Sequence, residues 1–210
     1  MVETRTDHVR RVAAVCIFAL SLAGCLDIKG HVGIKEDGSG EAILKFGLVN
    51  SIYYQLPPKD KQSFCDGLNV PEIFGRPERV ASEKYVYCKF SRAFPHVKYL
   101  KMDSVVAGEE NDGTWSLILD LPQMISKTMM KKGSEGRDQM PRSLDEPLQK
   151  SIQVTFSVSA PHIISTNGLV SEDHKTARYI TNLADLLHNP EGIFTVRFYC
   201  RKGWFGGKKC

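Results

Sequence analysis

The chain has 210 residues, of which 42% are hydrophobic and 25% charged. This composition is that of an ordinary globular protein, and it excludes collagen-like, low-complexity and wholly disordered chains. The net charge of +4 is too small to indicate a nucleic-acid-binding domain, in which Lys and Arg usually cluster on a strongly basic surface.

The first 24 residues predict a lipoprotein signal peptide. A polar lead ends in Arg10-Arg11. The apolar core of eleven residues that follows, from Val12 to Leu22, is too short to span a bilayer as a helix but typical of a signal peptide. Small residues at 23 and 24, followed by Cys25, resemble the bacterial lipobox, in which the cysteine is acylated and becomes the first residue after cleavage. The alternatives are an ordinary signal peptide with an unrelated cysteine and a short buried helix. We expect an acyl anchor on Cys25.

An acyl anchor would attach the protein to a membrane of the bacterial cell envelope. Leu26, rather than Asp, after the cysteine favours the outer membrane in a Gram-negative host. No later apolar run exceeds ten residues, so no later segment is expected to cross a bilayer as a helix.

The first half of the mature chain shows hairpin patterns. Alternating apolar residues at 28–34 and 42–46 flank an Asp37-Gly38 turn, which predicts a β-hairpin. The other elements expected here are a short helix at 57–68 with prolines in its first turn, a strand at 85–90, and a strand at 97–106 that pairs with 114–119 across a turn at 108–113.

The second half begins with an amphipathic helix, because apolar residues recur at helical spacing from Leu121 to Met129 and the pattern ends near Gly133. Residues 133–149 are polar and rich in Gly and Pro, which predicts a mobile loop. The elements expected after it are a strand at 151–159, a turn at Asn167-Gly168, a strand at 176–180, a helix at 182–188 and a strand at 193–199. About eight strands and three short helices predict an α+β fold with a largely antiparallel sheet of hairpins over residues 25–199.

Cysteine usage agrees with export. Once Cys16 has left with the signal peptide and Cys25 carries lipid, the remaining even set predicts two disulfides with three possible connectivities: Cys65, Cys88, Cys200 and Cys210. The local pairs Cys65–Cys88 and Cys200–Cys210 are favoured because they close small loops. A zinc site is the alternative, but the chain has no CxxC motif and its histidines are scattered. We expect no metal and no cofactor.

Two stretches carry a family resemblance. One runs from Gly24 to Ile28 into the hairpin turn at 36–40; the other comprises residues 154–156, Pro161 and 165–168, followed by a hydrophobic strand. Together they resemble the LppM-type lipoprotein domain of mycobacterial surface lipoproteins and related bacterial envelope proteins. The resemblance covers Cys25 to about Phe198 and implies a lipid-anchored α/β domain that binds lipids or glycolipids. The sequence departs from the mycobacterial pattern in having no C-terminal spanning helix and in its four additional cysteines.

Catalytic patterns are weak. Ser39 lies in a hairpin turn rather than in a nucleophile elbow. Asp112 and Asp120 flank a strand that carries Trp115, a pattern that also occurs at sugar sites, but solvated loop and strand-end carboxylates explain it equally. No phosphate-binding glycine loop or dinucleotide motif is present in the sequence. We therefore expect a protein that is not an enzyme.

Two groups of residues suggest ligand or partner contacts. Met124, Met129 and Met130 have side chains that adapt to irregular apolar ligands, although core packing is their ordinary role. The loop that begins at Gly133 is placed to cover such a ligand, and disorder explains that loop equally. In the tail at 200–210, basic residues surround Trp204 and Phe205, which suits an anionic membrane surface or a protein partner; a pinned C-terminus that covers the core edge is the alternative.

These observations lead to two functional hypotheses. The first is a lipid-anchored envelope protein whose domain binds a lipid or glycolipid in an apolar groove. The second is a structural or assembly subunit that binds another envelope protein through a sheet edge or through the tail. No nucleic-acid partner is expected.

Overall fold

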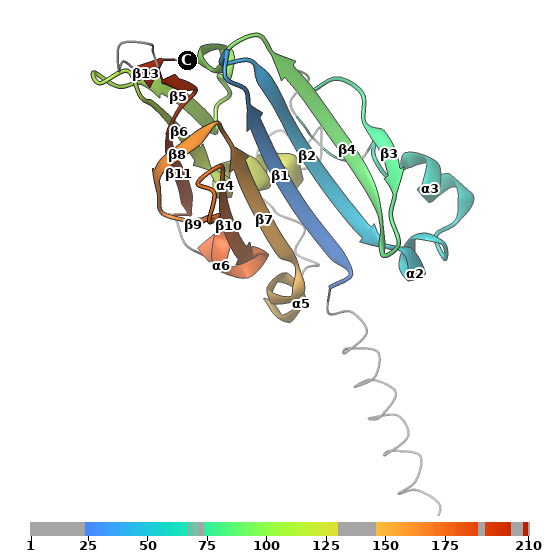
Figure 1. Ribbon diagram of the computed structural model, residues 1–210. Coiled ribbons are helices and arrows are strands. Elements are labelled where there is room, and N and C mark those ends of the chain that lie inside the picture. Colours follow the sequence, from blue (N-terminus) through green and yellow to red (C-terminus); the bar gives the residue numbers. More distant parts are fainter. Residues whose placement is uncertain are drawn as a thin grey trace, which may run out of the picture.

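The computed structural model describes residues 24–66, 68, 70, 74–129, 146–188, 192–202 and 208–209. These residues form two β-sheets with short helices at their ends (Figure 1). All strand pairs are antiparallel except β1 with β7, which is parallel. The predicted α+β class with largely antiparallel sheets is confirmed.

The larger sheet has seven strands, in the spatial order β3 (Glu78–Ala81), β4 (Tyr85–Phe94), β2 (Gly40–Val49), β1 (Leu26–Ile34), β7 (Gln153–Ser159), β10 (Thr176–Asn182) and β9 (Leu169–Val170). The smaller sheet has the order β5 (Val105–Glu109), β6 (Trp115–Asp120), β11 (Ile193–Tyr199) and β8 (His162–Thr166). A two-stranded ribbon pairs β12 (Arg201–Lys202) with β13 (Lys208–Lys209).

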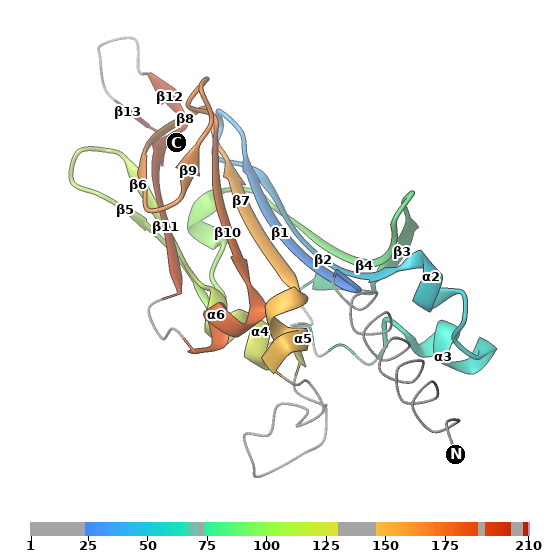
Figure 2. The ribbon, with the colours of Figure 1, turned by 90° about the horizontal axis from the view of Figure 1, so that it is seen from below.

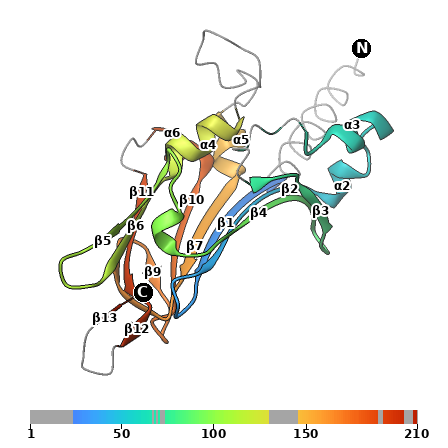
Figure 3. The ribbon, with the colours of Figure 1, turned by 90° about the horizontal axis from the view of Figure 1, so that it is seen from above.

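The helices are α2 (Asn50–Tyr53), α3 (Pro58–Ser63), α4 (Leu121–Met129), α5 (Glu146–Ser151) and α6 (Leu183–His188), and η2 (Val97–Tyr99) is a 3₁₀ turn. Figure 2 shows α4, α5 and α6 together at one end of the two sheets. Figure 3 shows α2 and α3 beside the part of the larger sheet that curls away from the smaller one.

The core lies between the two sheets. Alternation along each strand turns every second side chain inward, so both inner faces are apolar. The larger sheet contributes buried side chains that include Val32, Leu44, Phe90 and Phe156. The smaller sheet contributes Leu117, Leu119, Phe194 and Phe198, none of which is more than 2% exposed. These side chains belong to one continuous hydrophobic cluster.

Elements with strong local signals form as predicted. The first hairpin pairs β1 with β2 and closes through Gly38, whose positive φ of 79° suits a residue without a Cβ. Asp37 stabilises this turn, because its carboxylate accepts a hydrogen bond from the Ser39 N–H. Strand β11 begins and ends at the expected residues. Helix α3 has its prolines at the expected end but stops at Ser63 rather than at 68.

The expected strand at 97–106 is wrong. Val97 begins the 3₁₀ turn η2, and strand β5 starts only at Val105. Val97 and Leu100 are both fully buried, and a spacing of three lets both side chains enter the core from one turn of helix. The His96 ring caps the turn by accepting a hydrogen bond from the Lys98 N–H.

The predicted boundary between loop and strand near residue 150 is also wrong. Residues 146–149 belong to α5 rather than to the loop, and β7 begins at Gln153 rather than at 151. An i,i+4 ion pair between Glu146 and Lys150 (2.7 Å) supports this helical turn. Residues 133–145 of the expected loop lie outside the described part of the chain. The sequence predicted three short helices, and the described residues form two more, α2 and α5.

Candidate functional site

Helix α4 forms one wall of an apolar pocket. The Asp120 carboxylate caps the helix by accepting a hydrogen bond from the Gln123 N–H (2.9 Å). Leu121 and Ile125 are fully buried in the core, which leaves the half-buried Met124 at the pocket. The pocket has a volume of about 260 Å³ and is lined by Leu44, Phe74, Lys101, Met102, Asp103, Ser104, Met124, Lys127 and Thr128.

The interior and the rim of this pocket differ in polarity. Leu44 and Phe74 are buried, and the two methionines, Met102 and Met124, are the other apolar side chains of the lining. At the rim, the Lys127 ammonium lies 2.8 Å from the Asp103 carboxylate, and this hydrogen bond lowers the pKa of Asp103. Lys101 is exposed beside them. An apolar interior with cations at its mouth suits a hydrocarbon chain that ends in an acidic group.

The structure places one of the three predicted methionines at this pocket. Met124 lines it, whereas Met130 and the side chain of Met129 lie outside the described residues. Met102, which sequence reasoning missed, lies on the connection before β5. No periodic pattern links Met102 to α4, so only the tertiary fold reveals that the two methionines line one pocket.

The expected acylation site lies directly before the first strand of the larger sheet. Strand β1 begins at Leu26, directly after Cys25. The Cys25 carbonyl accepts a hydrogen bond from the Val49 N–H (2.9 Å), and the Tyr85 hydroxyl donates one to the Gly24 carbonyl (2.9 Å). Cys25 itself is 5% exposed, and this burial raises the pKa of its thiol.

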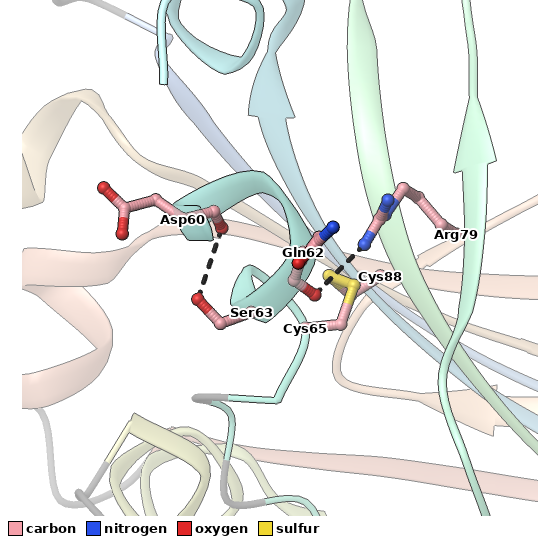
Figure 4. The surroundings of a disulfide bond; sticks show 6 residues. All are labelled: Asp60, Gln62, Ser63, Cys65, Arg79 and Cys88. Carbon is pink, nitrogen blue, oxygen red and sulfur yellow. Dashed lines mark hydrogen bonds between the residues drawn. A yellow bond between two sulfur atoms is a disulfide. The ribbon is translucent and has the colours of Figure 1, made fainter. Parts of the chain in front are cut away.

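The predicted disulfide between Cys65 and Cys88 is present and ties the segment after α3 to strand β4 (Figure 4). Beside it, the Arg79 guanidinium on β3 donates a hydrogen bond to the Gln62 carbonyl (3.3 Å). The predicted bond between Cys200 and Cys210, and the aromatic tail residues Trp204 and Phe205, cannot be compared because Cys210 and residues 203–207 lie outside the described residues. Those expectations stay predictions.

A polar cluster that sequence reasoning missed lies on the outer face of the larger sheet. Asp27 is 3% exposed, and its carboxylate accepts a hydrogen bond from the Tyr87 hydroxyl (2.6 Å) and pairs with the Lys29 ammonium (2.7 Å). Burial and the hydrogen bond to Asp27 raise the pKa of Tyr87 to about 12. Tyr87 therefore remains a donor at physiological pH.

The weak catalytic patterns correspond to structural contacts. The Ser39 hydroxyl donates to Asp37 within the hairpin turn. Asp112 accepts hydrogen bonds from Thr114 and pairs with Arg197 (2.8 Å), while Asp120 is the cap of α4. Among the residues whose positions are described, no three His, Cys, Asp or Glu side chains are grouped to hold a metal ion. No helix in this part of the chain is long and apolar enough to span a membrane.

No protein-family model matches the chain, and no curated protein matches it. Among solved structures, the NMR structure of the folded domain of LppM from Mycobacterium tuberculosis is similar, with a TM-score of 0.47 and 12% sequence identity. The match covers 84% of this chain and 90% of that one.

Proposed function

We propose that this protein is a lipid-anchored protein of the bacterial envelope whose domain binds one acyl chain of a lipid or glycolipid in the α4 pocket. The apolar pocket with a cationic rim is the observation that carries the proposal. Its volume of about 260 Å³ lies just below the range typical of drug-sized ligands, which suits a segment of a single chain rather than a whole lipid.

The energetics of acyl burial are sufficient for a binding role. Each buried methylene contributes about 0.8 kcal/mol, so about six methylenes would contribute roughly 5 kcal/mol before ordering costs. Lys101 at the rim would add attraction for an acidic headgroup, whereas the charge of Lys127 is already balanced by Asp103. Methionines suit such a pocket because their unbranched side chains adjust to a flexible chain.

The junction at Cys25 supports the anchor. Because β1 starts one residue later, an acyl group on Cys25 would attach the domain to the membrane with almost no tether. The anchor is tested by expressing the Cys25→Ser variant in bacterial cells that process lipoproteins. We expect the variant to keep its signal peptide and to lose acyl modification in mass spectra. A Cys25→Ser protein that is cleaved and still carries the same acyl mass would refute the assignment.

The pocket is tested by native mass spectrometry of the full chain purified in nonionic detergent. We expect adducts of lipid mass beyond any covalent anchor, and we expect Met124→Asp to reduce them at least tenfold, because a buried carboxylate in an apolar pocket is costly. Val106→Asp is the matched control, since Val106 is 57% exposed on the smaller sheet. Equal amounts of lipid adduct in the unchanged protein, Met124→Asp and Val106→Asp would exclude this pocket as the lipid-binding site.

A second candidate function, assembly with another envelope protein, is favoured by an apolar sheet edge. Strand β9 forms one edge of the larger sheet, where Leu169 is 67% exposed and Ile180 on the neighbouring β10 is 51% exposed. Exposed edges of this kind accept further strands. Leu169→Lys should then abolish co-purification of the partner while leaving lipid adducts unchanged, whereas retention of the partner would exclude this edge.

A further inference from the structure

Three lysines stand in a row on the outer face of the larger sheet. Lys29 on β1 lies directly opposite Lys45 on β2, and Lys45 lies directly opposite Lys89 on β4. Like charges opposite one another destabilise a sheet, so such a row needs compensating negative charge.

Two of these cations have partners in the chain. The Lys29 ammonium pairs with Asp27 (2.7 Å), and the Lys89 ammonium pairs with Glu78 (3.3 Å). Lys45, in the middle, makes no ion pair with any residue that the structure describes. Its ammonium lies 6.0 Å from the centre of the Tyr87 ring, and its side chain is half-buried. The compensation is therefore incomplete at Lys45.

A pocket of about 210 Å³ opens beside Lys45, between strands β2, β1 and β7. Lysine, histidine and hydroxyl side chains dominate its lining, which comprises Lys29, Gly30, His31, Ile43, Lys45, Thr155 and Ser157. The His31 ring nitrogen Nδ1 lies 2.9 Å from the Ser157 hydroxyl. Two ammonium groups, two hydroxyls and an imidazole thus border a space that is large enough for a small anion.

The neighbouring surface carries equal numbers of lysines and carboxylates. A larger depression of about 800 Å³ continues along the sheet from His31 and includes Lys35 and Lys175 in its lining. The carboxylates of this lining are Glu36 and Glu41. The two lysines and the two carboxylates are all exposed, so solvent screens both signs of charge, and the depression adds no net charge to the site.

We propose that the pocket at Lys45 binds a phosphate group, as free phosphate, a soluble phosphate ester or the phosphate of a lipid headgroup. Lys45 supplies the main charge and the Thr155 hydroxyl acts as a hydrogen-bond donor. The Lys29 ammonium already binds Asp27 and Tyr87 and offers its one remaining N–H. The Ser157 hydroxyl donates to the Gly30 carbonyl (3.3 Å) and would turn from it toward the bound anion. Ammonium and hydroxyl donors around a tetrahedral oxyanion form short, charge-assisted hydrogen bonds. The bound anion would also relieve the repulsion along the lysine row.

This site is separate from the pocket of the proposed function. Leu44 and Lys45 are consecutive on β2, and alternation points the first into the apolar pocket and the second to the outer face. Met124→Asp should therefore leave phosphate binding unchanged. Failure of one proposal does not imply failure of the other.

The test is a calorimetric titration of the full chain, in nonionic detergent micelles at constant ionic strength, with inorganic phosphate. We expect saturable binding that Lys45→Gln weakens about tenfold and Lys45→Arg restores, because the charge rather than the lysine itself attracts the anion. Lys98→Gln, at an exposed lysine on η2, is the control and should bind as the unchanged protein does. Absence of saturable binding, or equal binding in Lys45→Gln, would overturn the proposal.

The His31 ring provides a second readout within the folded protein. The charged groups on its own and the adjacent strand β2 are Lys29, Glu41 and Lys45, and Arg178 on β10 lies one strand further away, opposite Ser157. A bound dianion should raise the pKa of His31, measured from its ring resonances by NMR. An unmoved His31 pKa at phosphate saturation would place the anion elsewhere and overturn the assignment.

The source of the phosphate is decided by comparing two further titrants. Glycerol 3-phosphate is a soluble ester, and a short-chain phosphatidylglycerol carries the same group as a lipid diester. Binding of the lipid at least tenfold more tightly, with the same dependence on Lys45, would indicate a headgroup site. Equal or tighter binding of the soluble ester would indicate a site for free phosphate compounds. If neither titrant binds in a Lys45-dependent way, the site takes no phosphate ester and that part of the proposal fails.

Discussion

Asp27 is a carboxylate held out of water on the face of the larger sheet that lies opposite the core. Its charge is balanced by Lys29 and its remaining acceptor capacity is used by the Tyr87 hydroxyl. A buried charge of this kind tolerates the loss of a partner poorly, because the desolvated carboxylate then lacks compensation. The cluster lies two residues after the expected acylation site, so it also stabilises the beginning of β1.

Replacing Tyr87 by Phe should destabilise the fold by about 1–3 kcal/mol, because it removes one hydrogen bond from a buried carboxylate. Urea unfolding of the full chain measures the change. Tyr85→Phe is the matched control, since Tyr85 donates to the Gly24 carbonyl rather than to a charged group, and a smaller loss is expected. Equal stability of Tyr87→Phe and the unchanged protein would show that Asp27 does not depend on this donor.

His31 should make stability depend on pH in the mildly acidic range. Burial, the largest cause, lowers its pKa, so the folded state favours the neutral ring and the unfolded state binds more protons. Stability should therefore rise with pH up to the unfolded pKa of about 6.5 and be lost as pH falls below it. As the pH is lowered from 7.5 to 5.5, the unfolding free energy of His31→Gln should decrease less steeply than that of the unchanged protein. An identical slope in the variant would contradict this role.

The disulfide joins the residues directly after α3 to strand β4. It closes a loop with a sequence separation of 23, and Cys88 is fully buried against the core. The chain-entropy picture gives about 3 kcal/mol for a loop of this length.

Substituting both Cys65 and Cys88 by Ala should therefore lower the unfolding free energy by about 3 kcal/mol, measured by urea unfolding without reductant. A mild reductant should lower the stability of the original protein further than that of the variant. If the double variant unfolds at the same urea concentration as the original, the bond contributes little to stability and the entropy account is wrong here.

Local sequence signals predicted several elements well. The Asp37-Gly38 turn determines the first hairpin, and Asn182 caps α6 by accepting a hydrogen bond from the Asp185 N–H. The Cys65–Cys88 pairing followed from its short loop. The first two interactions join residues close in sequence, and the disulfide closes a loop with a sequence separation of only 23.

The pairing of strands that lie far apart in the sequence could not be predicted from such local signals. The parallel pairing of β1 with β7 joins Ile28 to Val154, and no local pattern encodes that partner. The turn at Asn167-Gly168 was predicted, but not that it carries the chain from the smaller sheet to the larger one. Gly168 allows this crossing because a Cβ there would lie 2.3 Å from the Arg178 carbonyl oxygen. The pocket lined by Met102 and Met124 could not be predicted for the same reason, since Met102 lies near α4 only in the folded chain.

At the scale of the whole molecule, the two faces of the larger sheet carry different chemistry. Its inner face contributes Leu44 to the apolar pocket, and its outer face presents Lys45 beside a polar one. Strand β1, which starts at the proposed anchor, lies in the middle of this sheet and pairs with β2 and β7. A membrane attachment at Cys25 would therefore act directly on the element that joins both halves of the sheet.

The acyl-chain pocket is tested most directly by NMR of the full chain with ¹³C-labelled methionine methyl groups in deuterated nonionic micelles. The chain has six methionines, and Met102 and Met124 line the pocket. With a protonated fatty acid added, the account predicts intermolecular NOEs from the acyl methylenes to the methyl groups of Met102 and Met124, and their loss at Met102 in Met124→Asp. Saturating fatty acid without NOEs to either methyl group would contradict the proposed function.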